Sequence, residues 1–201
     1  MKTKSGSVLV ALLLSVVVLS SVSAQSAVEY QLAMEGSQDQ LANGLLFMYE
    51  EEKLARDVYL ALFDTWKIRT FQNIANSEQQ HMDAIASVLE QRGIANPALN
   101  GQRGVFLNQE ISNLYTQLVA QGKSSPSEAL LIGATIEDLD IRDLEAYLLE
   151  TSEADVTGVY MHLLKGSENH MVAFTSQLRR YGMTYSAQYI TQDRLQSIIA
   201  R

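Results

Sequence analysis

The chain contains no cysteine among its 201 residues. This absence excludes disulfides, thiolate metal sites, haem attachment through cysteine and a cysteine nucleophile. A metal site in this chain must therefore use oxygen atoms and imidazole nitrogens as ligands. That ligand set suits iron, manganese, zinc or calcium, depending on the coordination geometry.

Basic residues are also few. The chain carries 15 Lys and Arg against 23 Asp and Glu, which gives a formal net charge of −8. The sequence has no basic patch interleaved with aromatic residues, so nucleic acid is not an expected partner. The acidic balance instead favours solubility and the attraction of cations.

No apolar run in the chain is as long as the roughly 20 residues that span a bilayer. The N-terminal run, residues 8–19, follows two lysines and precedes the small-residue pattern Val22-Ser23-Ala24. We therefore predict a secretory signal peptide over residues 1–24, cleaved after Ala24. An uncleaved membrane anchor is the alternative. Cleavage predicts a periplasmic or extracellular protein with no stable membrane insertion.

Four stripes of apolar residues at helical spacing occupy the rest of the chain, within residues 41–66, 71–88, 130–148 and 160–181. Ser37 with Gln40 resembles a capping box that opens the first helix. Ser125 followed by Pro126 is the strongest start signal, with a cap and a proline at the first helical position. The pattern predicts an all-α bundle of four helices over residues 37–182.

The connection between the second and third helices, residues 92–123, is long and repeatedly broken by glycine and proline. We expect one short amphipathic helix in it, at residues 106–119. A connection of this length lets the third helix start at the same end of the bundle as the second. An up-down bundle with one long crossover is the ferritin-like arrangement. Residues 25–36 are expected to form a flexible leader, and residues 183–201 a tail with a short helix at 192–200.

Each apolar stripe is interrupted near its midpoint by ionisable residues, namely Glu52, Glu78 with His81, Glu137, and His170. Folding would place three carboxylates and two imidazoles at one level of the bundle interior. Buried charges are tolerated only when they are paired or coordinate a cation. These five residues are therefore the candidate metal ligands.

Each candidate also has a structural interpretation. Glu52 follows two other glutamates, so the three could form an exposed acidic face with Arg56 as an i,i+4 partner. Glu137 could be a surface acid, and His170 a core histidine bonded to the backbone. His162 is interpreted as structural or exposed because it lies off the stripe.

The motifs resemble a known family. Glu52-x-x-Ala55-Arg56-x-x-Tyr59 is similar to the first-helix signature of rubrerythrin-like proteins, and Glu78-x-x-His81 to their second-helix metal motif. Residues 44–180 resemble the ferritin-like family catalogued as domain of unknown function 2202. The resemblance implies two metal ions, held by one Glu from each of two helices and a Glu-x-x-His pair from each of the others.

The fourth helix departs from that pattern, because Ser167 stands where a glutamate is expected three residues before His170. The three matching glutamates would offer three negative charges to four positive ones. Asp140 and Glu168 are the candidates to supply the missing carboxylate. Helical geometry favours Asp140, because a step of three from Glu137 stays on nearly the same face.

The sequence leaves three classes of function open. A metal-binding protein without turnover leads, with one or two divalent ions and with iron or manganese expected before zinc or calcium. A dinuclear oxidase or peroxidase of the rubrerythrin type, acting on oxygen, peroxide or ferrous iron, is the first alternative. It would need an external electron donor. Rubrerythrins proper receive electrons through a cysteine-ligated iron domain, and this chain has no cysteine. A structural bundle with a decayed site is the second alternative, and a homodimer is compatible with all three.

In the oxidative alternative, Glu78 would bridge the two ions, and His81 and His170 would each fix one of them. Arg56 and Asp57, next to the site on the first helix, would then orient the ligands.

Overall fold

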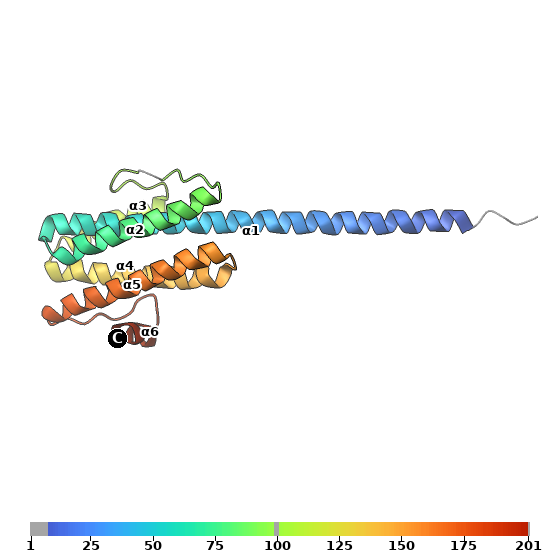
Figure 1. Cartoon of the computed structure of the whole chain (residues 1–201). Coiled ribbons are helices and arrows are strands. Elements are labelled where there is room, and N and C mark those ends of the chain that lie inside the picture. Colours follow the sequence, from blue (N-terminus) through green and yellow to red (C-terminus); the bar gives the residue numbers. More distant parts are fainter. Residues whose placement is uncertain (1–7, 99–100, 201) are drawn as a thin grey trace, which may run out of the picture. The chain divides into compact units, whose positions relative to one another are not determined.

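The structure is a computed structural model that describes the backbone of residues 8–98 and 101–200, with side chains described from residue 36 onward except for residue 37. Within these ranges it contains six helices and no strand (Figure 1). The helices are α1 (Val8–Trp66), α2 (Arg69–Gln91), α3 (Gln109–Gly122), α4 (Pro126–Glu150), α5 (Ala154–Arg180) and α6 (Gln192–Ile199). The prediction of an all-α chain is confirmed.

The start of the first helix differs from the prediction. α1 begins at Val8 rather than at Ser37, so the expected leader at residues 25–36 is helical. The sequence from Val8 to Trp66 contains no proline, so no residue removes a helical amide donor. Contacts divide the chain into two compact units, Met1–Leu41 and Ala42–Arg201. Among the helices that the structure describes, none has the length and apolar character needed to cross a membrane.

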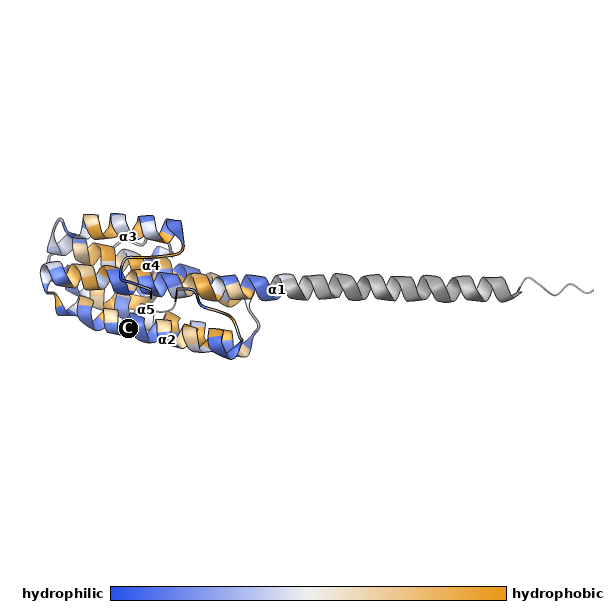
Figure 2. Cartoon of the chain, turned by 90° about the horizontal axis from the view of Figure 1, so that it is seen from above, coloured by the Kyte–Doolittle hydropathy of each residue, from blue (hydrophilic) through white to orange (hydrophobic). Residues whose placement is uncertain are grey.

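The second unit is a helical bundle in which α4 lies along α5, while α2 and α6 also pack against α5 and α3 packs against α4. Figure 2 shows hydrophilic and hydrophobic residues alternating along these helices, as expected of amphipathic helices. The stripe predicted for the second helix is fully buried, and it comprises Phe71, Ile74, Glu78, His81, Ile85 and Val88. The periodic pattern thus identified the inner face of α2 correctly.

Three aromatic rings join helices α1, α2 and α5 one to two turns from the polar level. The ring of Tyr59 lies 6.0 Å from that of Phe71 and 5.2 Å from that of Phe174, measured between centroids. Gly133 of α4 makes room for this cluster, because a Cβ atom there would lie 2.4 Å from the ring of Phe174. The cluster closes one end of the polar centre with apolar surface.

The long connection reaches α4 through α3, which starts three residues later than predicted. Asn108 caps α3, because its side chain accepts hydrogen bonds from the amides of Glu110 and Ile111. Glu50 of α1 fixes this point further by accepting from the amides of Leu107 at 2.6 Å and Asn108 at 2.8 Å. A contact between distant parts of the chain therefore sets where α3 begins.

The C-terminal tail is held against α4 and α5 by buried polar contacts. Asp138, fully buried on α4, accepts hydrogen bonds from the Tyr185 hydroxyl and from the amides of Gln188, Tyr189 and Ile190. The predicted short helix of the tail is present as α6. A carboxylate with four donors fixes the tail to the outer side of the helix that carries Glu137.

Candidate metal centre

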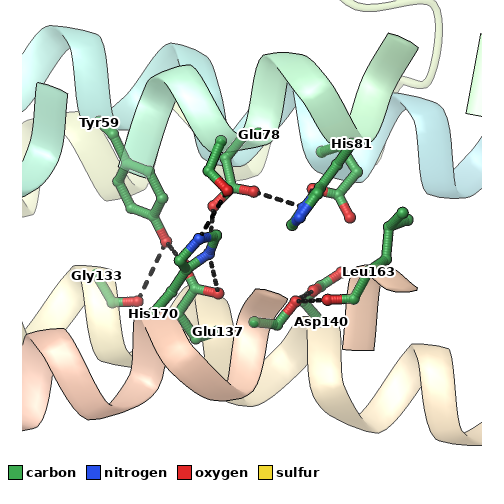
Figure 3. Close-up of polar contacts among 11 residues, drawn as sticks. Tyr59, Glu78, His81, Gly133, Glu137, Asp140, Leu163 and His170 are labelled. Carbon is green, nitrogen blue, oxygen red and sulfur yellow. Dashed lines mark hydrogen bonds and ion pairs between the residues drawn. The ribbon is translucent and has the colours of Figure 1, made fainter. Parts of the chain in front are cut away.

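All five predicted ligands meet inside the bundle, between four helices. Figure 3 shows Glu78, His81, Glu137 and His170 facing one another. α1 supplies Glu52, α2 supplies Glu78 and His81, α4 supplies Glu137 and α5 supplies His170. None of the five is more than 7% exposed. The structural interpretation of Glu52 as part of an exposed acidic face is therefore wrong.

Glu78 lies at the middle of the cluster, and its two carboxylate oxygens face different imidazoles. Oε2 lies 2.9 Å from Nδ1 of His81, and Oε1 lies 3.0 Å from Nδ1 of His170. Glu52 is 3.1 Å from the first of these nitrogens, and Glu137 is 3.4 Å from the second. The result is two adjacent groups of potential ligands that share Glu78.

The positions of these atoms are also suited to coordination of a cation. Both Glu78 oxygens and Nδ1 of His170 are buried and lack an aligned hydrogen-bond partner among the described residues, although they lie close together. Two ligand atoms about 2.1 Å from one metal ion and at right angles to each other are about 3 Å apart. The observed separations match that geometry.

The remaining surroundings of the imidazoles direct Nδ1 of each ring inward. Nε2 of His170 lies 3.0 Å from the Ser77 hydroxyl. Nε2 of His81 lies against Gly166, where a Cβ atom would approach it to 2.4 Å. The position of His170 is typical of metal-binding histidines, whose second nitrogen is fixed by a hydrogen-bonding neighbour.

Without metal, the protonated forms of the two histidines balance the negative charge of the cluster. Burial alone would lower the pKa of both imidazoles, but Glu52 and Glu78 raise the pKa of His81 to about 11. Glu78 and Glu137 raise the pKa of His170 to about 11. At neutral pH both rings are then imidazolium ions, which occupy the electrostatic role of a metal.

The pKa values of the carboxylates are shifted in opposite directions. Burial raises the pKa of Glu52 to about 7, and burial with the charge of Glu78 raises that of Glu137. Burial opposes the ionisation of Glu78 as well, but the two histidines lower its pKa to about 2. Glu78 is thus the most strongly stabilised anion of the cluster, in keeping with its place between both histidines.

From the sequence, Tyr59 could either hydrogen-bond a ligand or fill the core with its hydroxyl satisfied, and the structure shows a fully buried Tyr59 bonded to a candidate ligand. Its hydroxyl lies 2.5 Å from Oε1 of Glu137 and donates a hydrogen bond to it. Burial and the nearby carboxylates of Glu137 and Glu78 raise the pKa of Tyr59 well above its usual value, so the phenol keeps its proton. The oxygen of Glu137 that faces His170 is the other one, Oε2.

Ser167 stands where a glutamate is expected, and Asp140 of the neighbouring helix α4 lies next to it. The Ser167 hydroxyl donates to Oδ2 of Asp140, and Asp140 lines a small cavity with Glu51, Glu52, Glu78 and Glu137. Glu168, the other candidate for the missing carboxylate, instead lies 2.7 Å from Arg194 and 3.3 Å from Lys165. The structure therefore places Asp140, and not Glu168, beside the centre.

Arg56 and Asp57 were expected to orient the ligands in the oxidative alternative, but the hydrogen bonds that the structure gives them lead elsewhere. Arg56 pairs with Asp57 and Gln79, and Asp57 also binds Lys53 and the amide of Gly104. Neither residue contacts a candidate ligand through these bonds. Arg56 links α1 to α2, and Asp57 links α1 to the crossover.

His162 is exposed, as expected, with its ring centroid 5.8 Å from that of His81. Glu51 was not predicted as part of the site. It is only 8% exposed and lines the same cavity as the candidate ligands. Its position next to Glu52 was the only signal in the sequence.

Comparison with known proteins gives consistent results. The model of the DUF2202 family, described as an uncharacterized protein domain, matches residues 41–201. The uncharacterized protein MJ0754 of Methanocaldococcus jannaschii is 50% identical over 157 residues, which cover 78% of this chain and 85% of that protein. A crystal structure of hypothetical protein MJ0754 has a TM-score of 0.78 at 49% identity, covering 80% of this chain and 91% of that one. The family match and this relative agree, and the chain belongs to the DUF2202 family.

Proposed function

We propose that this protein is a ferritin-like metal-binding protein that holds two divalent ions in the bundle core. The observation that carries the proposal is the position of Glu78, whose two oxygens each face one histidine and one further carboxylate. A bridging carboxylate between two such groups is the arrangement of dinuclear carboxylate sites in helical bundles.

The order of the helices supports the ferritin-like assignment. The C-terminal part of α1 and α2 form one pair joined by a short turn, and α4 and α5 form a second pair. The crossover that contains α3 connects the two pairs. Each pair contributes one Glu from its first helix and a histidine from its second. The two pairs therefore supply candidate ligands in the same order along the chain.

The charge of the centre suits two divalent ions. Glu52, Glu78, Glu137 and Asp140 together carry four negative charges when ionised, which equals the charge of two such ions. The oxygen and imidazole ligands favour iron or manganese, with zinc as the alternative. Calcium fits less well, because it prefers six to eight oxygen ligands and the cluster presents two imidazoles.

We further propose that the protein is exported. The charged N-terminus, the short apolar run and the small residues before Gln25 support cleavage of residues 1–24. The mature chain of 177 residues (201 − 24) loses Lys2 and Lys4, so its formal charge becomes −10. An acidic protein outside the cytoplasm would attract divalent cations toward its binding site.

The direct test is elemental analysis of the mature protein purified without chelators, followed by reconstitution with Mn²⁺ or Fe²⁺. We expect close to two ions per chain. The matched control is the Glu78→Ala, His81→Ala double variant, which should lose the ions while the wild type retains them. A stably folded wild type that holds no metal and takes none up on reconstitution would contradict the proposal and leave the structural alternative.

A further inference from the structure

Two buried carboxylates beside the centre belong to neither group of ligands. Glu51 and Asp140 are each 8% exposed, and both line the cavity next to Glu52, Glu78 and Glu137. Oε2 of Glu51 and Oδ1 of Asp140 are buried and have no hydrogen-bond partner among the described residues. Such atoms are costly to bury unless a cation approaches them.

One oxygen of Asp140 is held in place, because Ser167 donates to its Oδ2 from the side of α5. Glu51 lies near Asp143, three residues after Asp140 on α4, and burial together with the charge of Asp143 raises the pKa of Glu51 well above its usual value. Oδ1 of Asp140 and Oε2 of Glu51 are left for a ligand.

Asp143 connects this pair to the surface. Its side chain is 15% exposed and is bound by Arg142, whose own side chain is 46% exposed. Glu51 therefore contacts a partly exposed acid on one side and lines the buried cavity on the other. Inward from the solvent, the order is Asp143, Glu51, the cavity, and then the glutamates of the centre.

The cavity is small, with about 10 Å³ open to the centre of a water-sized sphere. That volume is about the minimum that holds one water molecule, so it also admits one bare divalent ion. Two resident ions leave one of the five lining carboxylates unbalanced, which is too little charge to retain a third divalent ion permanently. One unbalanced negative charge suits an ion that binds briefly and then moves on.

We propose that Glu51 and Asp140 form a loading position, through which divalent cations pass from the surface at Asp143 to the two-metal centre. This inference rests on the proposed function, because it requires a centre that receives metal. The loading position binds an ion briefly through Oε2 of Glu51 and Oδ1 of Asp140. The ion then moves to Oε1 of Glu52, another buried oxygen without a hydrogen-bond partner among the described residues.

The test measures the rate of Co²⁺ uptake by the metal-free full chain after rapid mixing, followed by the visible absorbance of bound Co²⁺. Glu51→Gln removes the charge of the outer residue with little change in shape. We expect this variant to load at least tenfold more slowly and still to bind two ions at equilibrium. Glu90→Gln is the matched control, because it removes one charge from an exposed position on α2 and should load at the wild-type rate.

Thermal unfolding of the metal-free Glu51→Gln variant checks that it is folded. A wild-type loading rate in the folded variant would overturn the inference. Loss of a bound ion at equilibrium in Glu51→Gln would also overturn it, because Glu51 would then be a resident ligand. Failure of the wild type to bind Co²⁺ at all would instead reject the proposed function, so the two failures are distinguishable.

Discussion

Replacing Glu78 with glutamine is expected to abolish binding of at least one of the two ions. The substitution removes one negative charge from a buried centre and replaces one ligand oxygen with an amide nitrogen that carries two protons. Because both oxygens of Glu78 face a histidine, neither group of ligands stays complete. We expect the affinity for the more weakly held ion to fall at least 100-fold, measured by Mn²⁺ titration against a competing chelator.

Glu90→Gln, on the exposed side of the same helix, controls for the loss of one charge from α2. Circular dichroism and thermal unfolding of both variants establish that any loss of binding does not come from loss of fold. Two ions bound to Glu78→Gln with wild-type affinity would remove Glu78 from the bridging position.

The second large effect is a steep dependence of metal affinity on pH. Metal displaces the protons from His81 and His170, whose pKa values are both about 11 without metal. Between pH 6 and pH 8 each imidazole becomes about tenfold more available per pH unit, because its pKa lies well above this range. The product of the two dissociation constants for Mn²⁺ should therefore fall by about two orders of magnitude per pH unit.

Calorimetric titration in two buffers of different ionisation enthalpy gives the number of protons released. At pH 7 we expect at least two protons per two ions bound, with a further contribution from Glu52, whose pKa is about 7. Affinity that does not change with pH, together with no proton release, would show that the two imidazoles do not bind the metal.

The metal-free protein should show the opposite dependence of stability on pH. A histidine whose pKa is raised from 6.5 to about 11 stabilises the folded state fully below pH 6.5, and this contribution is lost as the pH rises toward 11. The lowered pKa of Glu78 contributes stability above pH 4.5 that is lost as the pH falls toward 2. The raised pKa of Glu52 makes its ionisation destabilising as the pH rises from 4.5 to 7.

The free energy of unfolding without metal should thus be greatest near pH 4.5 and fall as the pH rises, first through the ionisation of Glu52 and above pH 6.5 through both histidines as well. Metal binding then adds stability that increases with pH, so the difference between loaded and metal-free protein widens from pH 6 to pH 8. This is a second readout of the same proton exchange.

The burial of the candidate ligands at one level could be predicted from the sequence because these residues interrupt regular stripes. Glu78 and His81 stand at positions where helical spacing requires a buried residue, and the structure buries both. The same reasoning brought Glu52, Glu137 and His170 to one place. Periodicity fixes which face of a helix is turned inward, and an ionisable residue on that face is informative on its own.

The run of three glutamates on α1 shows where periodicity fails. Successive residues on a helix are about 100° apart, so three neighbours cannot share one face. All three are nevertheless buried, because the crossover covers Glu50 and the cavity beside α4 takes Glu51. Both coverings depend on segments more than 50 residues away, which no local pattern of α1 reveals.

The same limit applies to the tail and to Arg56. Asp138 follows Glu137 in what reads as an acidic run, but its partners lie at residues 185–190. Arg56 was assigned a role by its proximity to Glu52 along the helix, whereas its side chain turns to Asp57 and Gln79. The sequence shows which residues are neighbours along one helix. It does not show which residues of other segments they contact.

The central claim is that Glu78 bridges two metal ions, and crystallography of the Mn²⁺-loaded protein tests it most directly. Anomalous difference maps should show two peaks, one among Glu52, Glu78 and His81 and the other among Glu78, Glu137 and His170. Both peaks should lie about 2.1 Å from a Glu78 oxygen, as expected for oxygen ligands of a small divalent ion. Full loading with no anomalous peak adjacent to Glu78 would contradict the account.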